Sequence, residues 1–125
     1  MILDTCAVLW LGSGGGRLSP AALKQIKQAP EIYVSVISGF EIALKNTAGK
    51  LTLPLPPMDW LQQVIDSYSL TIVPLDLQTS IRAARLPRFH DDPYDRFIIA
   101  VAKSNNWTVV TTDERFESYG IEVIS

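Results

Sequence analysis

Apolar and polar positions alternate along the chain with two periods, one typical of short strands and one typical of helices. Short runs rich in apolar, β-branched and aromatic residues predict strands over residues 1–3, 32–34, 70–73, 107–110 and 121–124. The segments between them predict a helix after Asp4 and helices over residues 20–28, 37–48, 59–67, 78–85 and 93–104, with a helical turn at 113–116. This alternation favours an α/β fold in which helices flank a mostly parallel sheet.

Residues with special backbone preferences mark several predicted helix ends. Ser19 and Pro20 match an N-cap followed by a proline at the first helical position, and Asp92 and Pro93 repeat that pattern. Gly49 stands just after a predicted helix, where glycine is common. These signals support the helix assignments independently of the apolar spacing.

Length and composition indicate one globular domain. The chain has 125 residues, of which 47% are apolar and 19% charged, so it can bury a core and is not a disordered tail. The one low-complexity stretch, residues 12–16, predicts a flexible loop. Cys6 is the only cysteine and His90 the only histidine, which excludes an internal disulfide and disfavours a structural zinc site. We therefore expect a single domain over residues 1–125.

Two features predict a soluble, cytoplasmic protein without a membrane association. The longest uninterrupted apolar runs, Cys6–Leu11 and Phe97–Ala102, have six residues each, far below the roughly 20 that span a bilayer. Asp4 interrupts the apolar start of the chain and no basic residue precedes it, which argues against a signal peptide.

The charge balance is slightly acidic, with 11 Lys and Arg against 13 Asp and Glu. Nucleic-acid-binding domains are often basic, so net charge alone disfavours that class. However, a site of several carboxylates around a divalent cation also makes the formal charge negative, and the bound cation neutralises it. The placement of the acids therefore matters more than their number.

Four acidic residues are predicted to lie near one edge of the sheet. Asp4 and Asp113 follow predicted strands, and Glu41 and Asp95 lie early in predicted helices. Ligands of open parallel sheets bind beyond the carboxyl ends of the strands. Converging carboxylates repel one another and burial raises their pKa values, so such a cluster is costly without a cation. Ligation by oxygen alone favours Mg²⁺ or Mn²⁺.

Each acid also has a purely structural explanation. Ser38 and Glu41 match a capping box, which alone would explain Glu41. Asp92 is better explained as a helix cap, and capping of the turn that follows is an alternative explanation for Asp113. Asp95 lies where a helix dipole favours any carboxylate. Only the joint placement of the acids favours a metal site.

Positive side chains near the acids are candidates for contact with phosphate. Arg96 directly follows Asp95, so we expect it to pair with a site carboxylate or to reach a phosphate. The further candidates are Lys45, Lys50, Arg82, Arg85 and Arg88. A solvated helix face explains Arg82 and Arg85 equally well.

Other polar and aromatic residues have competing explanations. The hydroxyls of Thr5 and Thr111 are candidates for positioning carboxylates, water or substrate, with local backbone hydrogen bonds as an equal alternative. Trp107 is better explained by packing than by stacking on bases. We interpret His90 as a loop residue, with a general acid as the less favoured alternative.

Four short motifs stand in order along the chain. They are Ile2-Leu3-Asp4-Thr5, Glu41–Lys45 followed by Gly49-Lys50-Leu51, Leu86-Pro87 followed by His90 and Asp92–Arg96, and Thr111–Glu114. Together they resemble the PIN-domain ribonucleases, and most closely the VapC toxins of bacterial toxin–antitoxin modules. The resemblance covers nearly the whole chain, and H-x-D-P-x-D-R is its most specific part. The chain departs from the family at Phe40, where relatives often carry Trp, at Asp91, where a basic residue is common, and in its glycine-rich loop.

The resemblance implies a PIN-like three-layer fold with a five-stranded, mainly parallel sheet flanked by helices. It also implies Mg²⁺- or Mn²⁺-dependent endonuclease activity on RNA that leaves 5′-phosphate and 3′-hydroxyl ends. Asp4, Asp95 and Asp113 would hold the metal, directly or through water. Glu41 would orient or deprotonate the attacking water, and Asp92 would support the site from its edge. Family members typically form homodimers and are blocked by a VapB-like antitoxin.

Other classes share parts of this pattern. A catalytically silent PIN-like module would use the carboxylates as caps and bind a protein partner, but the presence of all four family acids disfavours it. A phosphate-receiver domain has a similar α/β plan, but it normally carries paired acids after its first strand, whereas Leu3 and Thr5 flank Asp4. A DNA flap nuclease needs substrate-gripping elements for which the chain is too short.

Overall fold

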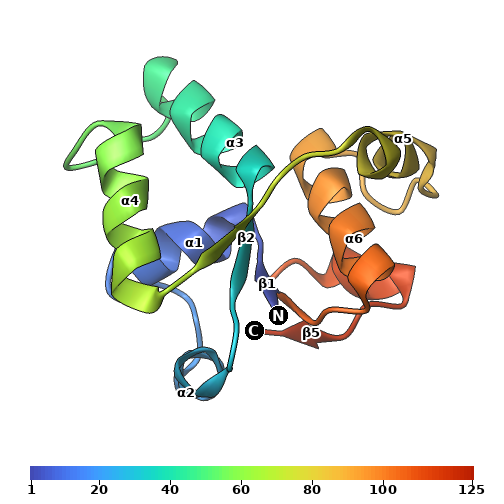
Figure 1. Cartoon of the computed structure of the whole chain (residues 1–125), viewed down its shortest axis with the longest axis horizontal. Helices are drawn as coiled ribbons and strands as arrows, with labels where there is room; N and C mark the ends of the chain where they lie inside the picture. Colours follow the sequence, from blue (N-terminus) through green and yellow to red (C-terminus); the bar gives the residue numbers. More distant parts are fainter.

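In the computed structural model, which describes residues 1–125, five strands form one sheet in the order β3-β2-β1-β4-β5 (Figure 1). The strands are β1 (Ile2–Leu3), β2 (Tyr33–Ser35), β3 (Thr71–Val73), β4 (Val109–Val110) and β5 (Val123–Ile124). The helices are α1 (Thr5–Gly12), α2 (Pro20–Gln28), α3 (Val36–Thr47), α4 (Pro57–Tyr68), α5 (Leu77–Arg85), α6 (Pro93–Asn105) and the 3₁₀ helix η1 (Glu114–Tyr119). Every strand pair is parallel, which confirms the predicted α/β class.

The strand order reverses between β1 and β4. The chain first adds β2 and β3 on one side of β1 and then places β4 and β5 on the other side. Leu3 accordingly pairs with Val34 on one side and with Val110 on the other. Because ligands bind beyond the carboxyl ends of parallel strands at such a reversal, the segments after β1 and β4 are the expected place for a site.

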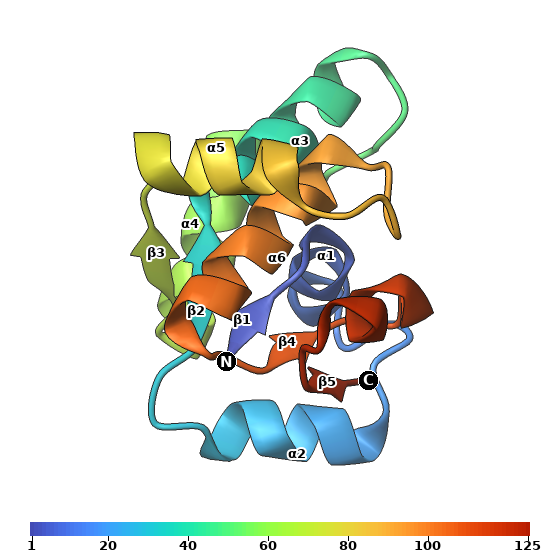
Figure 2. The same ribbon diagram turned by 90° about the vertical axis from the view of Figure 1, so that its right-hand side faces the viewer.

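The sheet separates two apolar cores. Successive strand residues point to opposite faces of a sheet, so Leu3 and Val110 pack with α1, α2 and α4, whereas Ile2 and Val109 pack with α6 and η1. Figure 1 shows α1 and α4 on one side of the strands and α5 and α6 on the other, and Figure 2 shows α2 below the sheet. The predicted three-layer arrangement is confirmed.

The predicted helix ends at Ser19 and Gly49 are confirmed. Ser19 caps α2 by accepting the N–H of Ala22, and Pro20 is the first residue of that helix. Gly49 follows the C-cap of α3 with φ of 73°, a left-handed conformation that glycine adopts at little cost. The longest helix, α6, has 13 residues, and none of the helices meets the length and apolarity that a membrane crossing requires.

The predicted capping box at Ser38 and Glu41 is wrong. Ser35, at the end of β2, caps α3 by accepting the N–H of Ile37, so the helix begins earlier than predicted. Ser38 therefore lies inside the first turn of α3, where its hydroxyl is 3.0 Å from that of Thr5 in α1. Helix capping consequently does not explain why Glu41 is buried.

The glycine-rich loop after α1 is packed rather than merely flexible. A Cβ at Gly12 would lie 2.5 Å from the Trp60 side chain, and one at Gly16 would lie 2.5 Å from Trp10. Gly16 also has a positive φ of 49°. Glycine is therefore required at Gly12 because Trp60 leaves no room for a side chain, and at Gly16 because of both Trp10 and the positive φ.

Candidate active site

The candidate site lies at the carboxyl ends of the neighbouring strands β1 and β4. Asp4 directly follows β1 and is the N-cap of α1, and its backbone N–H donates to the carbonyl of Val110 at 3.1 Å. Asp113 stands three residues beyond β4 and is the N-cap of η1. The fold thus places the first and fourth predicted acids on two strand-to-helix turns beside the reversal of strand order.

Asp4 is buried, with 5% of its surface exposed. Its Oδ1 accepts the N–H of Ala7 at 2.7 Å, and its carboxylate also accepts a hydrogen bond from the Thr111 hydroxyl. Burial nevertheless raises the pKa of Asp4 to about 6, and the negative charges of Asp113 and Glu41 add to that rise. A nearby cation would offset both causes.

Asp95 occupies the third position of α6, as predicted. Asp92 caps this helix by accepting the N–H groups of Tyr94 and Asp95 at 2.9 and 3.2 Å, which confirms the cap interpretation of Asp92. The pKa of Asp95 is raised to about 8. Burial is the largest cause, and the negative charges of Asp92 and of the other site acids are smaller causes of the same rise. Within the site, Asp95 is therefore the carboxyl group whose negative charge is least compensated.

Asp113 differs from Asp4 and Asp95 because an arginine two residues further along the chain, Arg115, neutralises its charge. Arg115 donates from Nε to Oδ1 at 3.0 Å and from a terminal nitrogen to Oδ2 at 2.7 Å. The backbone N–H of Arg115 and the imidazole of His90 donate two more hydrogen bonds, at 3.0 and 2.9 Å. The Arg115 side chain is the main reason why the pKa of Asp113 falls to about 2. These donors use the four acceptor positions of the carboxylate.

Glu41 reaches the site from α3. Its Oε2 accepts a hydrogen bond at 2.5 Å from the ammonium of Lys45, one turn further along the helix. Its Oε1 is buried and has no hydrogen-bond partner. A buried acceptor without a donor is costly, so this oxygen has an unfilled position for a ligand.

The side chain of His90 lies inside the site, which the sequence interpretation as a loop residue missed. Only 1% of His90 is exposed, and its Nε2 lies 2.9 Å from Oδ2 of both Asp95 and Asp113. Its Nδ1 accepts the backbone N–H of Asp92 at 3.1 Å. The spacing of a lone histidine two residues before a helix-capping aspartate is the sequence signal for this placement.

Arg96 does not contact a site carboxylate, contrary to our prediction. Its guanidinium instead donates to four backbone carbonyls at distances between 2.7 and 3.2 Å, those of Ala84, Leu86, Pro87 and His90. These hydrogen bonds tie the loop before α6 to that helix. Arg96 therefore holds the segment that carries His90, and the N–H groups of its two terminal nitrogens are not free for phosphate.

Thr5 and Thr111 are both buried, so in this structure neither is available for direct contact with a substrate. Thr5 joins α1 to α3 through Ser38. Thr111 donates to the carboxylate of Asp4 and accepts the backbone N–H of Asp113 at 3.0 Å. Thr111 thus links the first and fourth acids and acts on their position.

The donor set fits a hard divalent cation. Carboxylate oxygens are the ligands that Mg²⁺ and Mn²⁺ favour. Asp4 and Asp95 keep acceptor positions that no protein donor fills, although His90 lies beside Oδ2 of Asp95. The unpartnered Oε1 of Glu41 adds a third oxygen. Asp113 is saturated with donors, so it would act through water or after Arg115 moves away.

Comparison with known proteins identifies the family to which this arrangement belongs. A family model described as PIN domain matches residues 1–122. The chain belongs to the PIN-domain family. Ribonuclease VapC22 of Mycobacterium tuberculosis is 34% identical over 120 residues, which cover 95% of this chain and 91% of the relative. This PIN domain is therefore of the VapC type.

Solved structures share the fold of this VapC-type chain. FitAcB from Neisseria gonorrhoeae superposes with a TM-score of 0.70 at 20% identity, over 99% of this chain and 96% of that one. DNA-bound VapBC from Salmonella typhimurium superposes with a TM-score of 0.66 at 25% identity, over 98% and 94%. Both cover nearly complete chains, so the similarity concerns the whole fold.

Proposed function

We propose that residues 1–125 form one PIN domain that acts as a Mg²⁺- or Mn²⁺-dependent endoribonuclease, the toxin of a cytoplasmic VapBC-type toxin–antitoxin module. The observation that carries this proposal is the convergence of Asp4, Glu41, Asp95 and Asp113 at the reversal of strand order. The charges of the other three acids each raise the pKa of Asp95, so the four carboxylates interact electrostatically. The relationship to Ribonuclease VapC22 supports RNA as the substrate.

The site residues would have different roles in phosphodiester hydrolysis. A bound Mg²⁺ or Mn²⁺ would polarise the phosphate and stabilise the charge of the leaving oxygen. Asp4 and Asp95 would hold this cation directly, and Asp113 would do so through water or after releasing Arg115. Glu41 would orient the attacking water and accept its proton through Oε1, which is buried and unpartnered. The products would be a 5′-phosphate and a 3′-hydroxyl.

Exposed cations of α3 and α5 would bind the RNA backbone. Lys45 keeps 46% of its side chain exposed although it pairs with Glu41, so it can turn toward a phosphate. Arg82 and Arg85 are exposed in the last turns of α5, where Arg82 donates to Ser104 at 2.7 Å. Contacts of this kind set affinity and salt dependence without selecting a sequence.

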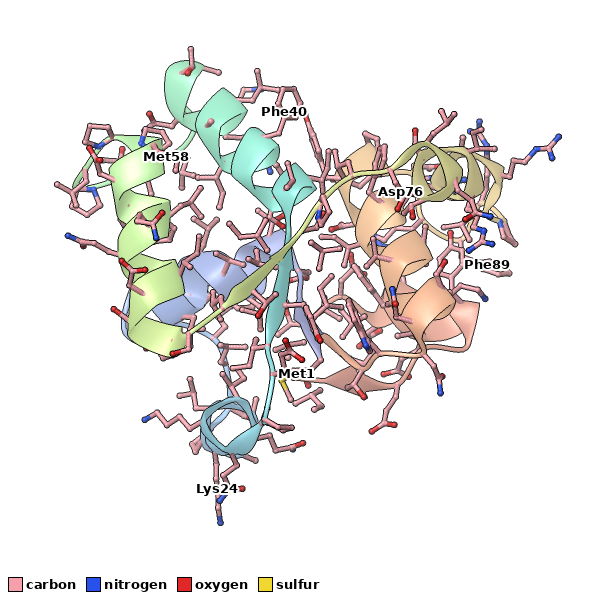
Figure 3. All side chains as sticks on the ribbon, in the orientation of Figure 1. Met1, Lys24, Phe40, Met58, Asp76 and Phe89 are labelled. Atoms are coloured by element: carbon pink, nitrogen blue, oxygen red, sulfur yellow. The ribbon has the colours of Figure 1, made fainter.

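Exposed apolar residues support the proposed homodimer and antitoxin. Phe40 and Leu44 lie one turn apart on α3, and Leu77 and Ile81 lie one turn apart on α5; all are between 47% and 77% exposed. Figure 3 shows Phe40 on the side of α3 that faces the chain leading into α5, and both helices lie at the same end of the molecule in Figures 1 and 2. A second copy or a VapB-like partner would cover this surface.

A cleavage assay tests the proposal. The chain is incubated with mixed RNA in Mg²⁺, in Mn²⁺ or in EDTA, and compared with Asp4→Asn and with the matched control Asp59→Asn, an exposed aspartate of α4. We expect cleavage by the unaltered chain and by Asp59→Asn in either metal, and none in EDTA or by Asp4→Asn. Cleavage that survives both chelation and Asp4→Asn would contradict the metal mechanism.

A further inference from the structure

His90 is held in a fixed orientation by contacts around its ring and backbone. Its backbone N–H donates to the Tyr119 hydroxyl at 2.9 Å, and its carbonyl accepts a hydrogen bond from Arg96 at 3.0 Å. The ring of Phe116 meets the imidazole edge-on, with centroids 5.7 Å apart. These contacts anchor the loop without Nε2 of the imidazole, which leaves that nitrogen available for another role.

The hydrogen bonds of the imidazole assign its tautomer. Nδ1 accepts the backbone N–H of Asp92, so this nitrogen carries no proton. The ring proton is therefore on Nε2, the atom that lies 2.9 Å from Oδ2 of both Asp95 and Asp113. An Nε2 that carries a proton cannot bind a metal ion. The three residues lie close enough to hold a metal together, but the imidazole faces the carboxylates as a donor.

We propose that His90 is a positioning residue whose Nε2–H holds the carboxylates of Asp95 and Asp113 in the geometry that receives the cation. These carboxylates come from different elements, the start of α6 and the turn after β4, and they repel each other when both are charged. A buried N–H donor between them opposes that repulsion. Outer partners that orient ligands in this way contribute about 10- to 100-fold to metal affinity.

Two substitutions separate the two nitrogens of the ring. His90→Gln places an amide N–H near the position of Nε2 and loses the acceptor for Asp92. His90→Asn keeps an acceptor near the position of Nδ1 and lacks a donor that reaches the carboxylates. If His90 acts through Nε2–H, the glutamine variant retains function and the asparagine variant loses it. If the imidazole only holds the loop through Nδ1, the asparagine variant retains function and the glutamine variant loses it.

The measurement is Mn²⁺ binding to the purified chain, by titration calorimetry, with thermal unfolding in EDTA as a check of folding. We expect His90→Asn to weaken Mn²⁺ affinity by about 10- to 100-fold, and His90→Gln to stay within about threefold of the unaltered chain, well below that range. Equal affinities for the two variants, or tighter binding by His90→Asn, would overturn the proposal.

Nitrogen NMR of the unaltered chain provides a test that needs no variant to fold. Because His90 is the only histidine, its two ring nitrogens give an unambiguous signal. We expect Nδ1 without a proton and Nε2 with one, both in EDTA and after addition of Mg²⁺. An Nε2 without a proton, either in EDTA or after Mg²⁺ is added, would refute the role of His90 as a donor.

This inference rests on the metal site of the proposed function, but the two can fail separately. Mn²⁺ binding that follows the predicted order of variants, without any RNA cleavage, would reject the ribonuclease and keep the role of His90. If His90→Asn changes neither RNA cleavage nor Mn²⁺ binding, the ribonuclease proposal stands and the proposed role of His90 is rejected.

Discussion

The two pairs of acids in the site differ in how their charge is neutralised. Neither Asp4 nor Asp95 pairs with a lysine or arginine, although the His90 imidazole lies 2.9 Å from Asp95, and burial raises the pKa values of the two acids to about 6 and about 8. Asp113 and Glu41 are paired with Arg115 and Lys45, respectively. The first pair thus has no lysine or arginine of the chain to balance its charge, whereas each acid of the second pair has one. A single acidic cluster can therefore contain both carboxylates that are free to bind a cation and carboxylates that are already paired with a basic side chain of the protein.

The largest expected effect comes from removing a member of the uncompensated pair. Asp95→Asn keeps the shape of the side chain but removes the charge, so Mn²⁺ affinity and RNA cleavage should fall by more than about 100-fold, beyond what an outer partner contributes. Inducible expression of the unaltered chain should arrest growth, and Asp95→Asn should relieve the arrest at equal protein levels. Asp59→Asn is the control, and a fully toxic Asp95→Asn would show that Asp95 is not a ligand.

The next effect is a pH dependence of stability that a cation should remove. Because Asp4 and Asp95 have raised pKa values, the folded chain binds more protons than the unfolded chain between about pH 4 and pH 8. The free energy of unfolding in EDTA should therefore fall as the pH rises through this window. The pKa of Asp113 is lowered, so its contribution is lost only in stronger acid.

Thermal unfolding at several pH values, in EDTA and with saturating Mg²⁺, measures this dependence. The decline toward pH 8 should be much smaller with Mg²⁺, since the cation favours the ionised carboxylates that a high pH produces. Asp95→Asn should remove most of the decline in EDTA. A stability that rises from pH 5 to pH 8 in EDTA would contradict the assignment of uncompensated acids.

A smaller effect is expected from unpairing Glu41. Lys45→Met leaves the buried carboxylate without its cation and should lower the free energy of unfolding in EDTA by about 1 kcal/mol, a modest value because solvent screens the half-exposed lysine. Lys24→Met, on the exposed side of α2 at the far end of the molecule in Figure 3, is the matched control. Saturating Mg²⁺ should reduce the difference between the two variants, and an unchanged difference would place Glu41 outside the metal site.

The smallest effect has the opposite sign. Arg115→Gln releases the acceptor positions of Asp113, so Mn²⁺ affinity should increase by about two- to fivefold, in keeping with the weak energetics of an exposed ion pair. Arg17→Gln, an exposed arginine in the loop before α2, is the control. Weaker Mn²⁺ binding by Arg115→Gln alone would mean that Arg115 orients Asp113 instead of competing with the cation.

Local sequence signals were sufficient for most of the fold. The α2 helix is predicted from Ser19 and Pro20 with its observed bounds, and the predicted range of α6, residues 93–104, differs from the observed one by a single residue. The capping-box prediction at Ser38 failed because Ser35, three residues earlier, is the N-cap of the same helix. Sequence spacing alone cannot choose between these two serines, because the position where β2 ends determines which hydroxyl meets the free N–H groups of the helix.

What the sequence determined by itself is therefore the set of elements and the acids attached to their ends, because periodicity, caps and short motifs act over a few residues. The tertiary structure alone decided which side chains meet. It directs the Arg96 guanidinium to backbone carbonyls and places His90 between Asp95 and Asp113. These contacts depend on how the loop before α6 folds against η1, and long-range packing of this kind leaves no periodic trace in the chain.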